Sequence, residues 1–355
     1  MHVNRFIGSL RFIKAITHGI TTVCFLFGKR KERKTMKIKK IVSIVLAAAL
    51  LVACVLSLSA CGEKKVYTVG ICQLVRHEAL DAATQGFKDA LVKALGEENV
   101  TFIEQNAQND TNACSTIVTD FVSKNVDLIL ANATPALQAA FNATQTIPVL
   151  GTSITEYGVA LGINDFNGTV GGNVSGTSDL APLTEQADMI LELFPEAKNV
   201  GLIYCSAEAN SAYQIKVIEE YLTAKGLTCT RYSFSDSNDI SAVTTTAASQ
   251  SDVIYIPTDN TAASCTETIG NIVREKKVPV VAGEQGIAAG CGVATLSISY
   301  YDLGVKTGEM AAKILKGEAN ISEMPIEYAT ATKMYNPEIC NELGITIPDG
   351  YTAIQ

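Results

Sequence analysis

The sequence predicts an α/β protein built from two similar Rossmann-like lobes with parallel sheets, joined by a hinge that the chain crosses several times. Three observations predict this fold class. Short β-branched runs alternate with segments of helical periodicity. The alternation stops at a polar, glycine-rich passage over 162–179 and then begins again. The 295 residues that follow position 60 also exceed the usual size of one hydrophobic core.

The first series of elements begins with an apolar strand at 66–72 and a helix at 80–95. Further apolar runs at 100–103, 126–131 and 147–150 are separated by helical segments at 112–124 and 135–144. Because each strand is followed by a helix, the strands are expected to lie parallel in one sheet.

The second series repeats this order, with runs at 199–205, 210–225, 228–234, 240–249, 252–256, 262–276 and 278–282. Local sequences repeat as well, since 126–136 resembles 251–262 and 147–149 resembles 278–280. The remaining segments at 294–299, 301–316 and 327–333 are expected to cross back between the lobes as a hinge. One lobe is therefore expected to hold 66–178 and 294–325, and the other 179–293 and 326–355.

The N-terminal region carries the features of a lipoprotein signal peptide. Lys37, Lys39 and Lys40 precede an uncharged apolar run over 41–58 that leads into the string LSACG at 58–62. This predicts a signal peptide at 36–60, a lipid on Cys61 and a tether at 61–65, with the protein exported and held on the outer face of the cytoplasmic membrane. A transmembrane anchor and lipidation of Cys54 are the alternatives. Residues 1–35 precede Met36 and are expected to reflect a misassigned start.

Composition limits the partners. Residues 1–60 hold eleven of the 28 basic residues and one of the 36 acidic residues, so the remainder has a net charge of −18. This charge argues against nucleic acid as a partner. Seven cysteines beyond Cys61 show no close pairing and do not indicate a disulfide framework.

Polar residues follow many of the predicted strands, and ligands of open parallel sheets bind beyond the carboxyl ends of the strands. The candidate ligand-binding residues are Gln73, His77, Thr134, Thr152, Ser153, Asp179, Ser206, Glu208, Asn210, Ser211, Asp259, Asn260 and Glu284. The alternative is that these side chains only cap the helices that follow. Asp259 and Glu284 are the strongest candidates for holding a ligand ammonium. Only Arg76 supplies a cation near a strand end, which disfavours polyanionic ligands and favours a zwitterion.

Two candidates have a second interpretation. His77, the one histidine after residue 60, could bind ligand, respond to pH or simply satisfy a loop. Asp179 could face the cleft or brace the hinge. Catalytic and nucleotide-binding motifs are missing from the sequence, and a single histidine leaves little for catalysis or metal ligation, so no enzyme activity, cofactor or metal is expected.

Several strings resemble the ABC transporter substrate-binding proteins assigned to uptake of tryptophan, tyrosine or related amino acids. They are GICQL at 70–74, HEALD at 77–81, NVSGTSD at 173–179, YCSAEANS at 204–211, IPTDNT at 256–261 and SYYDLG at 299–304, and the likeness extends over nearly all of 66–350. The resemblance implies a type I periplasmic-binding fold with the ligand between the lobes, and it supports Gln73, Thr134, Ser206, Asn210, Asp259 and Asn260 as cleft residues. Glu78 and Tyr157 stand where proline is frequent in the family.

From this resemblance we expect a monomeric solute-binding lipoprotein that captures a small amino acid and delivers it to an ABC permease with its ATPase. Rings able to stack on an aromatic ligand are Tyr157, Phe166, Tyr204, Tyr213 and Tyr300. A ligand-sensing surface lipoprotein, a hydrolase, and a binding protein for a nucleoside or sugar-like solute are the alternatives.

Overall fold

The structure is a computed structural model that describes residues 65–354. The predicted leader, the early start and the lipidation site at Cys61 lie outside the described residues. None of the helices in the described range is long and apolar enough to cross a membrane.

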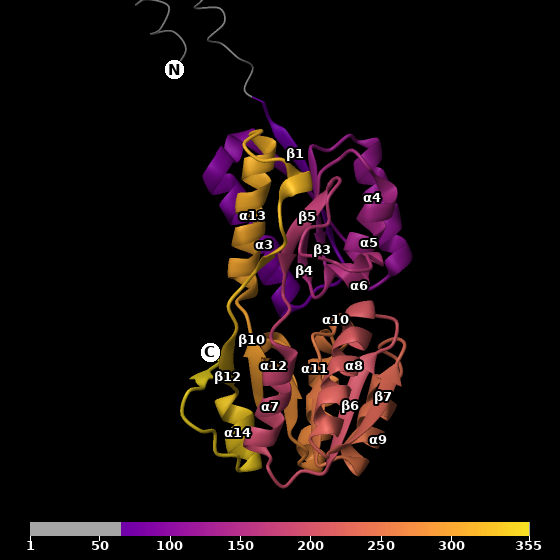
Figure 1. Ribbon diagram of the computed structural model, residues 1–355, viewed down its shortest axis with the longest axis vertical. Coiled ribbons are helices and arrows are strands. Elements are labelled where there is room, and N and C mark those ends of the chain that lie inside the picture. Colours follow the sequence, from indigo (N-terminus) through magenta and orange to yellow (C-terminus); the bar gives the residue numbers. More distant parts are fainter. Residues whose placement is uncertain (1–64, 355) are drawn as a thin grey trace, which may run out of the picture. The chain divides into compact units, whose positions relative to one another are not determined.

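The N-terminal lobe contains a six-stranded sheet in the order β11-β5-β4-β3-β1-β2. Its strands are β1 (Tyr67–Gln73), β2 (Val100–Asn106), β3 (Leu128–Asn132), β4 (Val149–Ile154), β5 (Val174–Ser178) and β11 (Glu327–Tyr328). All neighbouring pairs in this sheet are parallel. Helices α3 (Glu78–Leu95) and α13 (Tyr300–Leu315) cover one face, and α4 (Thr111–Ser123), α5 (Thr134–Ala143) and α6 (Tyr157–Leu161) cover the other (Figure 1).

The C-terminal lobe contains a seven-stranded sheet in the order β13-β12-β10-β9-β8-β6-β7. Its strands are β6 (Asn199–Cys205), β7 (Thr228–Phe234), β8 (Val253–Ile256), β9 (Val280–Ala282), β10 (Ala294–Ser297), β12 (Thr332–Tyr335) and β13 (Thr352–Ala353). Only the β10–β12 pair is antiparallel. One face packs on α7 (Leu183–Leu193), α8 (Ala209–Ala224) and α14 (Pro337–Leu343), and the other packs on α9 (Ile240–Gln250), α11 (Thr266–Lys276) and α12 (Gln285–Cys291).

The central strands explain why two lobes form. Every residue of β3 and of β8 is buried, as expected for parallel strands covered by helices on both faces. Each lobe thus has apolar clusters on both faces of its own sheet. The similar strings at 126–136 and 251–262 correspond to these two strands and the segments that follow them.

The chain passes between the sheets three times, after β5, after β10 and after β11. These passages differ from the expected boundaries at 294 and 326. Residues Ala294–Ser297 pair with β9 and β12 in the second sheet, and Glu327–Tyr328 pair with β5 in the first. The backbone ladder that a strand joins decides its lobe, and the hydrophobicity of the strand does not reveal that ladder.

Helix α13 begins at the second passage and packs tightly on α3 of the N-terminal lobe. A Cβ atom on Gly304 would lie 2.0 Å from the Ala83 carbonyl oxygen, and one on Gly86 would lie 2.1 Å from the Tyr301 carbonyl oxygen. Glycine at both positions therefore permits an approach that no other residue allows. This contact fixes the start of α13 beside the start of α3.

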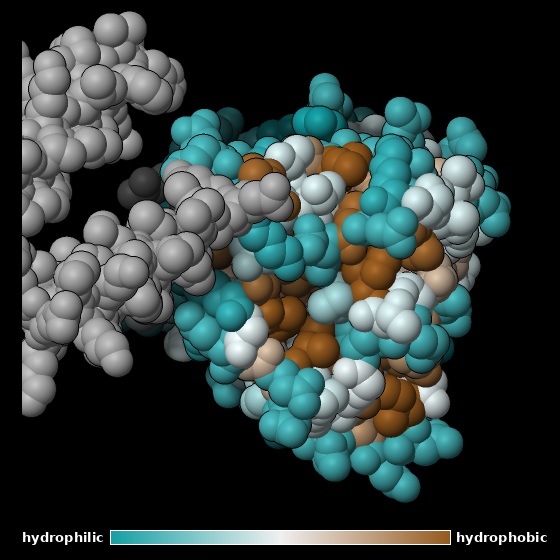
Figure 2. All heavy atoms as spheres, turned by 90° about the horizontal axis from the view of Figure 1, so that it is seen from above, coloured by the Kyte–Doolittle hydropathy of each residue, from teal (hydrophilic) through white to brown (hydrophobic). Residues whose placement is uncertain are grey.

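Large apolar side chains are mostly covered in the described part of the chain. Figure 2 looks onto the end of the N-terminal lobe and shows apolar side chains in hollows between hydrophilic ones. Across the described residues, the exposed large apolar side chains are Val66, Val159, Tyr301 and Tyr328. Val66 precedes β1 and the other three lie in α6, α13 and β11, and isolated exposed side chains of this kind are normal on a folded protein.

Candidate ligand-binding site

A small cavity lies between the two lobes, beyond the carboxyl ends of the strands. Its volume is about 10 Å³, enough for roughly one water molecule. The residues that line it are His77, Leu80, Ser153, Thr155, Asp179, Asn210, Thr258, Asp259, Asn260, Ala263, Glu284 and Tyr300. They come from the starts of helices, from the end of β4 and from the first passage between the lobes. The cavity therefore occupies the position at which open parallel sheets bind ligands.

Hydrogen bonds across the cleft hold the lobes together. Asn109 Nδ2, in the loop after β2, donates to Thr261 Oγ1 on α10 (Asn260–Ala263) at 2.9 Å. His77 Nε2 and Asn260 Oδ1 lie 3.4 Å apart. Since an amide oxygen can only accept, His77 must carry its proton on Nε2 for this contact. Loss of solvent lowers the pKa of His77, which favours the neutral ring. The structure is thus in a closed arrangement.

Seven of the thirteen residues expected from the sequence line the cavity: His77, Ser153, Asp179, Asn210, Asp259, Asn260 and Glu284. The other six, Gln73, Thr134, Thr152, Ser206, Glu208 and Ser211, do not line it. Among these six, Gln73, Thr134 and Ser206 are residues that the family resemblance supports for the cleft. Gln73 instead donates to Asp81 and accepts from Thr84, and Ser206 donates to the Phe234 carbonyl. Thr152 accepts from the hydroxyls of Thr177 and Thr307.

Glu208 does not line the cavity, but it positions residues of the C-terminal lobe that do. Its Oε1 accepts from the Thr261 backbone N–H and hydroxyl, at 2.9 and 2.8 Å. Its Oε2 accepts from the Asn260 backbone and side-chain N–H groups and from Asn210 Nδ2. Both oxygens are therefore occupied within the lobe, and Glu208 positions the residues that face the cavity.

Asp259 and Glu284 are caps of the helices that follow them. Asp259 Oδ1 accepts from the Ala262 N–H at 2.8 Å, and Oδ2 accepts from the Cys205 N–H at 2.6 Å. Glu284 accepts from the backbone N–H groups of Gly286 and Ile287. Burial, followed by repulsion from Glu208, raises the pKa of Asp259 to about 7. Burial likewise raises the pKa of Glu284 to about 7.

Asp179 is bonded differently. It follows β5 at the first passage, and its side chain is buried. Oδ2 accepts from the Tyr300 hydroxyl at 3.0 Å, whereas Oδ1 has no hydrogen-bond partner among the described residues. Burial raises the pKa of Asp179 to about 6, and the hydrogen bond from the Tyr300 hydroxyl acts against this rise. Of the three carboxylates that line the cavity, Asp179 is the one that keeps an unoccupied acceptor.

Two further lining residues have buried polar atoms without a partner in the described chain: Ser153 Oγ and Asn210 Oδ1. Ser153 also has a φ of 56°, which is uncommon for a residue with a side chain. Strained backbone and unpaired polar atoms often occur at ligand sites. No Lys or Arg is among the residues that line this cavity.

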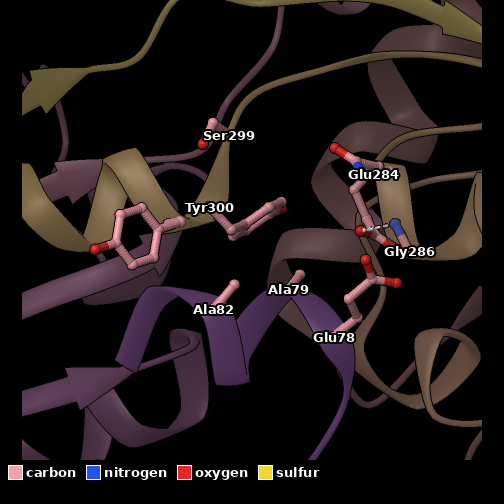
Figure 3. A pocket seen from close by; sticks show the side chains of 9 residues that line it. Glu78, Ala79, Ala82, Glu284, Gly286, Ser299 and Tyr300 are labelled. Atoms are coloured by element: carbon pink, nitrogen blue, oxygen red, sulfur yellow. Dashed lines mark hydrogen bonds between the residues drawn. The ribbon is translucent and has the colours of Figure 1, made fainter. Parts of the chain in front are cut away.

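A second space of about 160 Å³ adjoins the cleft and shares Glu284 and Tyr300 with it. Figure 3 shows Glu78, Ala79 and Ala82 of α3 on one side of this space, with Glu284 and Gly286 on the other. Its walls are therefore largely apolar on α3, with carboxylates of both lobes at one end.

Five cavity residues lie outside the thirteen candidates: Leu80, Thr155, Thr258, Ala263 and Tyr300. Thr155 and Thr258 follow strand runs and share the strand-end signal. Leu80 and Ala263 carry apolar side chains on helices and give no such signal. Of the five rings proposed for stacking, Tyr300 alone lines the cavity. Tyr157 and Phe166 stack on each other inside the N-terminal lobe, with ring centroids 6.4 Å apart.

Comparisons with known proteins agree with this geometry. The family model for the ABC transporter substrate binding protein matches residues 68–353. A tyrosine-binding protein of Clostridioides difficile (strain R20291) is 33% identical over 320 residues, which is 84% of this chain and 90% of the relative.

Two solved structures bear on the closed arrangement. An ABC domain from Streptococcus pneumonia in complex with L-Trp is 32% identical, with a TM-score of 0.77, and the match covers 82% of this chain and all of that one. The ligand-free, open structure of a substrate-binding protein with adhesive properties from Clostridium difficile is 37% identical but has a TM-score of 0.63. This match covers 82% of this chain and 99% of that one. The better fit to the ligand complex, despite lower identity, agrees with the hydrogen bonds across the cleft.

The fold is the type I periplasmic-binding fold, with a parallel-dominated sheet in each lobe and the cavity between the lobes. The family model covers more than half of the chain, and the tyrosine-binding relative exceeds 30% identity over most of both chains. The chain therefore belongs to the family of ABC transporter substrate-binding proteins.

Proposed function

We propose that the protein is an extracytoplasmic solute-binding lipoprotein of an ABC importer that captures a small amino acid between its lobes. One observation carries this proposal. The cavity between the lobes is lined by three buried carboxylates and by no Lys or Arg. Buried acids without a cationic partner suit a guest that brings a positive group, because the guest would supply the missing charge.

An aromatic amino acid is the favoured guest. The tyrosine-binding relative and the L-Trp complex each point to this class. A cavity of about 10 Å³ cannot hold such a molecule, so the lobes must move apart to admit it. The adjoining space of about 160 Å³ lies next to the Tyr300 side chain and offers room for a ring.

Ligand capture follows from contacts that both lobes make. A guest that hydrogen-bonds to residues of both lobes stabilises the closed form over the open one, so binding and closure are linked. The closed form would then be the state that a permease receives. Lipid on Cys61 would keep the protein near that permease.

A thermal-shift screen tests the proposed ligand class. The mature chain, starting at residue 61 with Cys61→Ser to avoid the acyl group, is heated with L-tyrosine, L-tryptophan, L-phenylalanine, L-leucine, a sugar and a nucleoside. A true ligand at one hundred times its Kd stabilises the folded state by about 2.7 kcal/mol, which raises Tm by several degrees. A shift with the sugar or nucleoside alone would contradict the amino-acid assignment.

Two further measurements separate the alternatives. A hydrolase would consume the compound that shifts Tm, so recovery of that compound unchanged after long incubation is the expected result. Metabolic labelling with a fatty acid should mark the full-length protein and should fail for Cys61→Ala. Label retained in that variant would contradict the predicted lipidation site.

A further inference from the structure

The buried acids around the cleft differ in how many of their oxygen atoms are occupied. Both oxygens of Glu208, of Asp259 and of Glu284 accept backbone N–H groups of their own lobe. Asp179 has one oxygen on the Tyr300 hydroxyl and one without a partner among the described residues. A buried carboxylate oxygen that accepts nothing is unfavourable, and a donor from outside the chain would relieve the cost.

Asn210 supplies a second free acceptor from the opposite lobe. Its Nδ2 has acceptors at Glu208 Oε2, Ser211 Oγ and the Thr258 carbonyl, at 3.3, 3.3 and 3.0 Å. These contacts fix which end of the amide is nitrogen, because a carboxylate and a carbonyl can only accept. The other end, Oδ1, has no partner in the described chain and belongs to a residue that lines the cavity.

Ser153 completes the set. Its hydroxyl lies at the end of β4, lines the same cavity and makes no hydrogen bond within the described residues. Asp179, Asn210 and Ser153 are only 4%, 4% and 6% exposed. Water therefore supplies few hydrogen bonds to the oxygen atoms of these three side chains in the closed structure.

We propose that Asp179 Oδ1, Asn210 Oδ1 and Ser153 Oγ form the subsite that binds the amino group of the ligand. An ammonium has three N–H donors, and these three oxygens are three acceptors, one of them charged. Asp179 follows β5 and Ser153 lies near the end of β4 in the N-terminal lobe, and Asn210 lies in the first turn of α8 in the C-terminal lobe. The ammonium thus joins the lobes, and the site selects ligands with a free cationic amino group.

Tyr300 acts as a positioning residue in this subsite. Its hydroxyl donates to Asp179 Oδ2, and the tight packing of α13 on α3 fixes where its helix begins. Asp179 Oδ1 is thereby left for the guest. Asp259 and Glu284, which the sequence analysis favoured for holding the ligand ammonium, instead cap the helices that follow them.

The inference rests on the proposed function, and calorimetry can test the two separately. The probes are L-tyrosine and 3-(4-hydroxyphenyl)propanoate, which lacks only the amino group. We expect the unaltered mature chain to prefer L-tyrosine by about 10- to 100-fold, the range for a hydrogen bond to a charged group. Asp179→Asn should lose most of that preference. The control, Asp120→Asn, removes a surface acid paired with Lys124 and should keep it.

The outcomes are distinct. A folded Asp179→Asn chain that keeps the full preference for L-tyrosine would overturn the subsite, and so would equal binding of both probes by the unaltered chain. If Asp179→Asn does not fold, the comparison of the two probes on the unaltered chain decides alone. If the unaltered chain binds no amino acid, the proposed function fails and the subsite fails with it.

Discussion

The hydrogen bond from Asn109 to Thr261 offers a test of how lobe closure controls affinity. Asn109 belongs to the N-terminal lobe, does not line the cavity and has a φ of 65°. Glycine adopts this backbone conformation without strain, so Asn109→Gly removes the side chain and little else. Its partner, Thr261, keeps its bonds to Glu208. The substitution therefore weakens the closed form without touching the proposed ligand contacts.

The expected change in ligand affinity follows from the free energy of one hydrogen bond. A neutral hydrogen bond contributes about 0.5–1.5 kcal/mol, which corresponds to about a 2- to 12-fold change in the balance between closed and open forms. If the free protein is mainly open, ligand affinity falls by the same factor, and the change is expected mainly in the dissociation rate. Calorimetry and stopped-flow measurements on Asn109→Gly provide both values, and small-angle scattering reports whether the free protein is open.

A matched control is available within one lobe. Gln138 Nε2 donates to the Ala160 carbonyl at 2.9 Å, the same distance as the bond across the cleft, and both residues lie in the N-terminal lobe. Gln138→Ala should change the stability and leave affinity unchanged. Unaltered affinity and dissociation in Asn109→Gly, with the free protein shown to be open, would refute the role of this bond in closure.

Four more predictions concern stability and pH. Gly304→Ala places a Cβ atom 2.0 Å from the Ala83 carbonyl oxygen. The free energy of unfolding, measured in urea, should therefore fall by about 1–3 kcal/mol. An unchanged free energy of unfolding would mean that α3 and α13 can separate freely. Asp259→Asn leaves one of two buried backbone N–H groups without an acceptor, so stability should fall by about 1–3 kcal/mol while the preference for L-tyrosine over its desamino analogue persists; loss of that preference would return Asp259 to the ligand site. The pKa of Asp179 is raised to about 6, and ammonium binding needs its ionised form, so affinity should rise from about pH 5 to about pH 7 and this rise should vanish in Asp179→Asn. In the ligand-free chain the contribution of Asp179 to stability is fully present below about pH 4 and is lost as pH rises through about 6. Thermal unfolding of the unaltered chain and of Asp179→Asn across this pH range measures that contribution as their difference, because His77, Asp259 and Glu284 line the cavity in both.

Repeating hydrophobic patterns predict most elements of the fold closely. The runs at 199–205 and 228–234 coincide with β6 and β7, and the helices predicted at 80–95 and 301–316 lie within two residues of α3 and α13. Helix α7 goes unpredicted, although its buried Leu183, Ala187 and Ile190 recur at helical spacing.

Strand β5 shows where such patterns fail. Its sequence is polar and carries a glycine, yet all five residues are buried. Gly176 has a φ of 146°, and a Cβ atom there would lie 2.1 Å from the Gly151 carbonyl oxygen. The strand is held by its pairing with β4 and β11 and by contacts such as Thr177 with Thr307, 130 positions away. Nothing in the local sequence expresses those partners.

The candidate site, like the fold, could be predicted from the sequence only in part. The strand-end rule brought seven of thirteen candidates to one cavity, because parallel strands end at one edge of a sheet. The rule could not rank the acids. Asp259 is occupied by the Cys205 N–H, 54 positions away, and Asp179 is bonded by Tyr300, 121 positions away.

The sequence alone determined the two α/β lobes, the family resemblance and the acidic, lysine-free and arginine-free strand ends apart from Arg76. The tertiary structure decided which sheet β10 and β11 join, which candidates face the cavity and which carboxylate oxygen stays free. The physical reason is the distance along the chain between the residues that interact. Hydrophobic periodicity is written in neighbouring residues, whereas the pairing of a buried polar atom depends on partners that only the folded chain brings within hydrogen-bond distance.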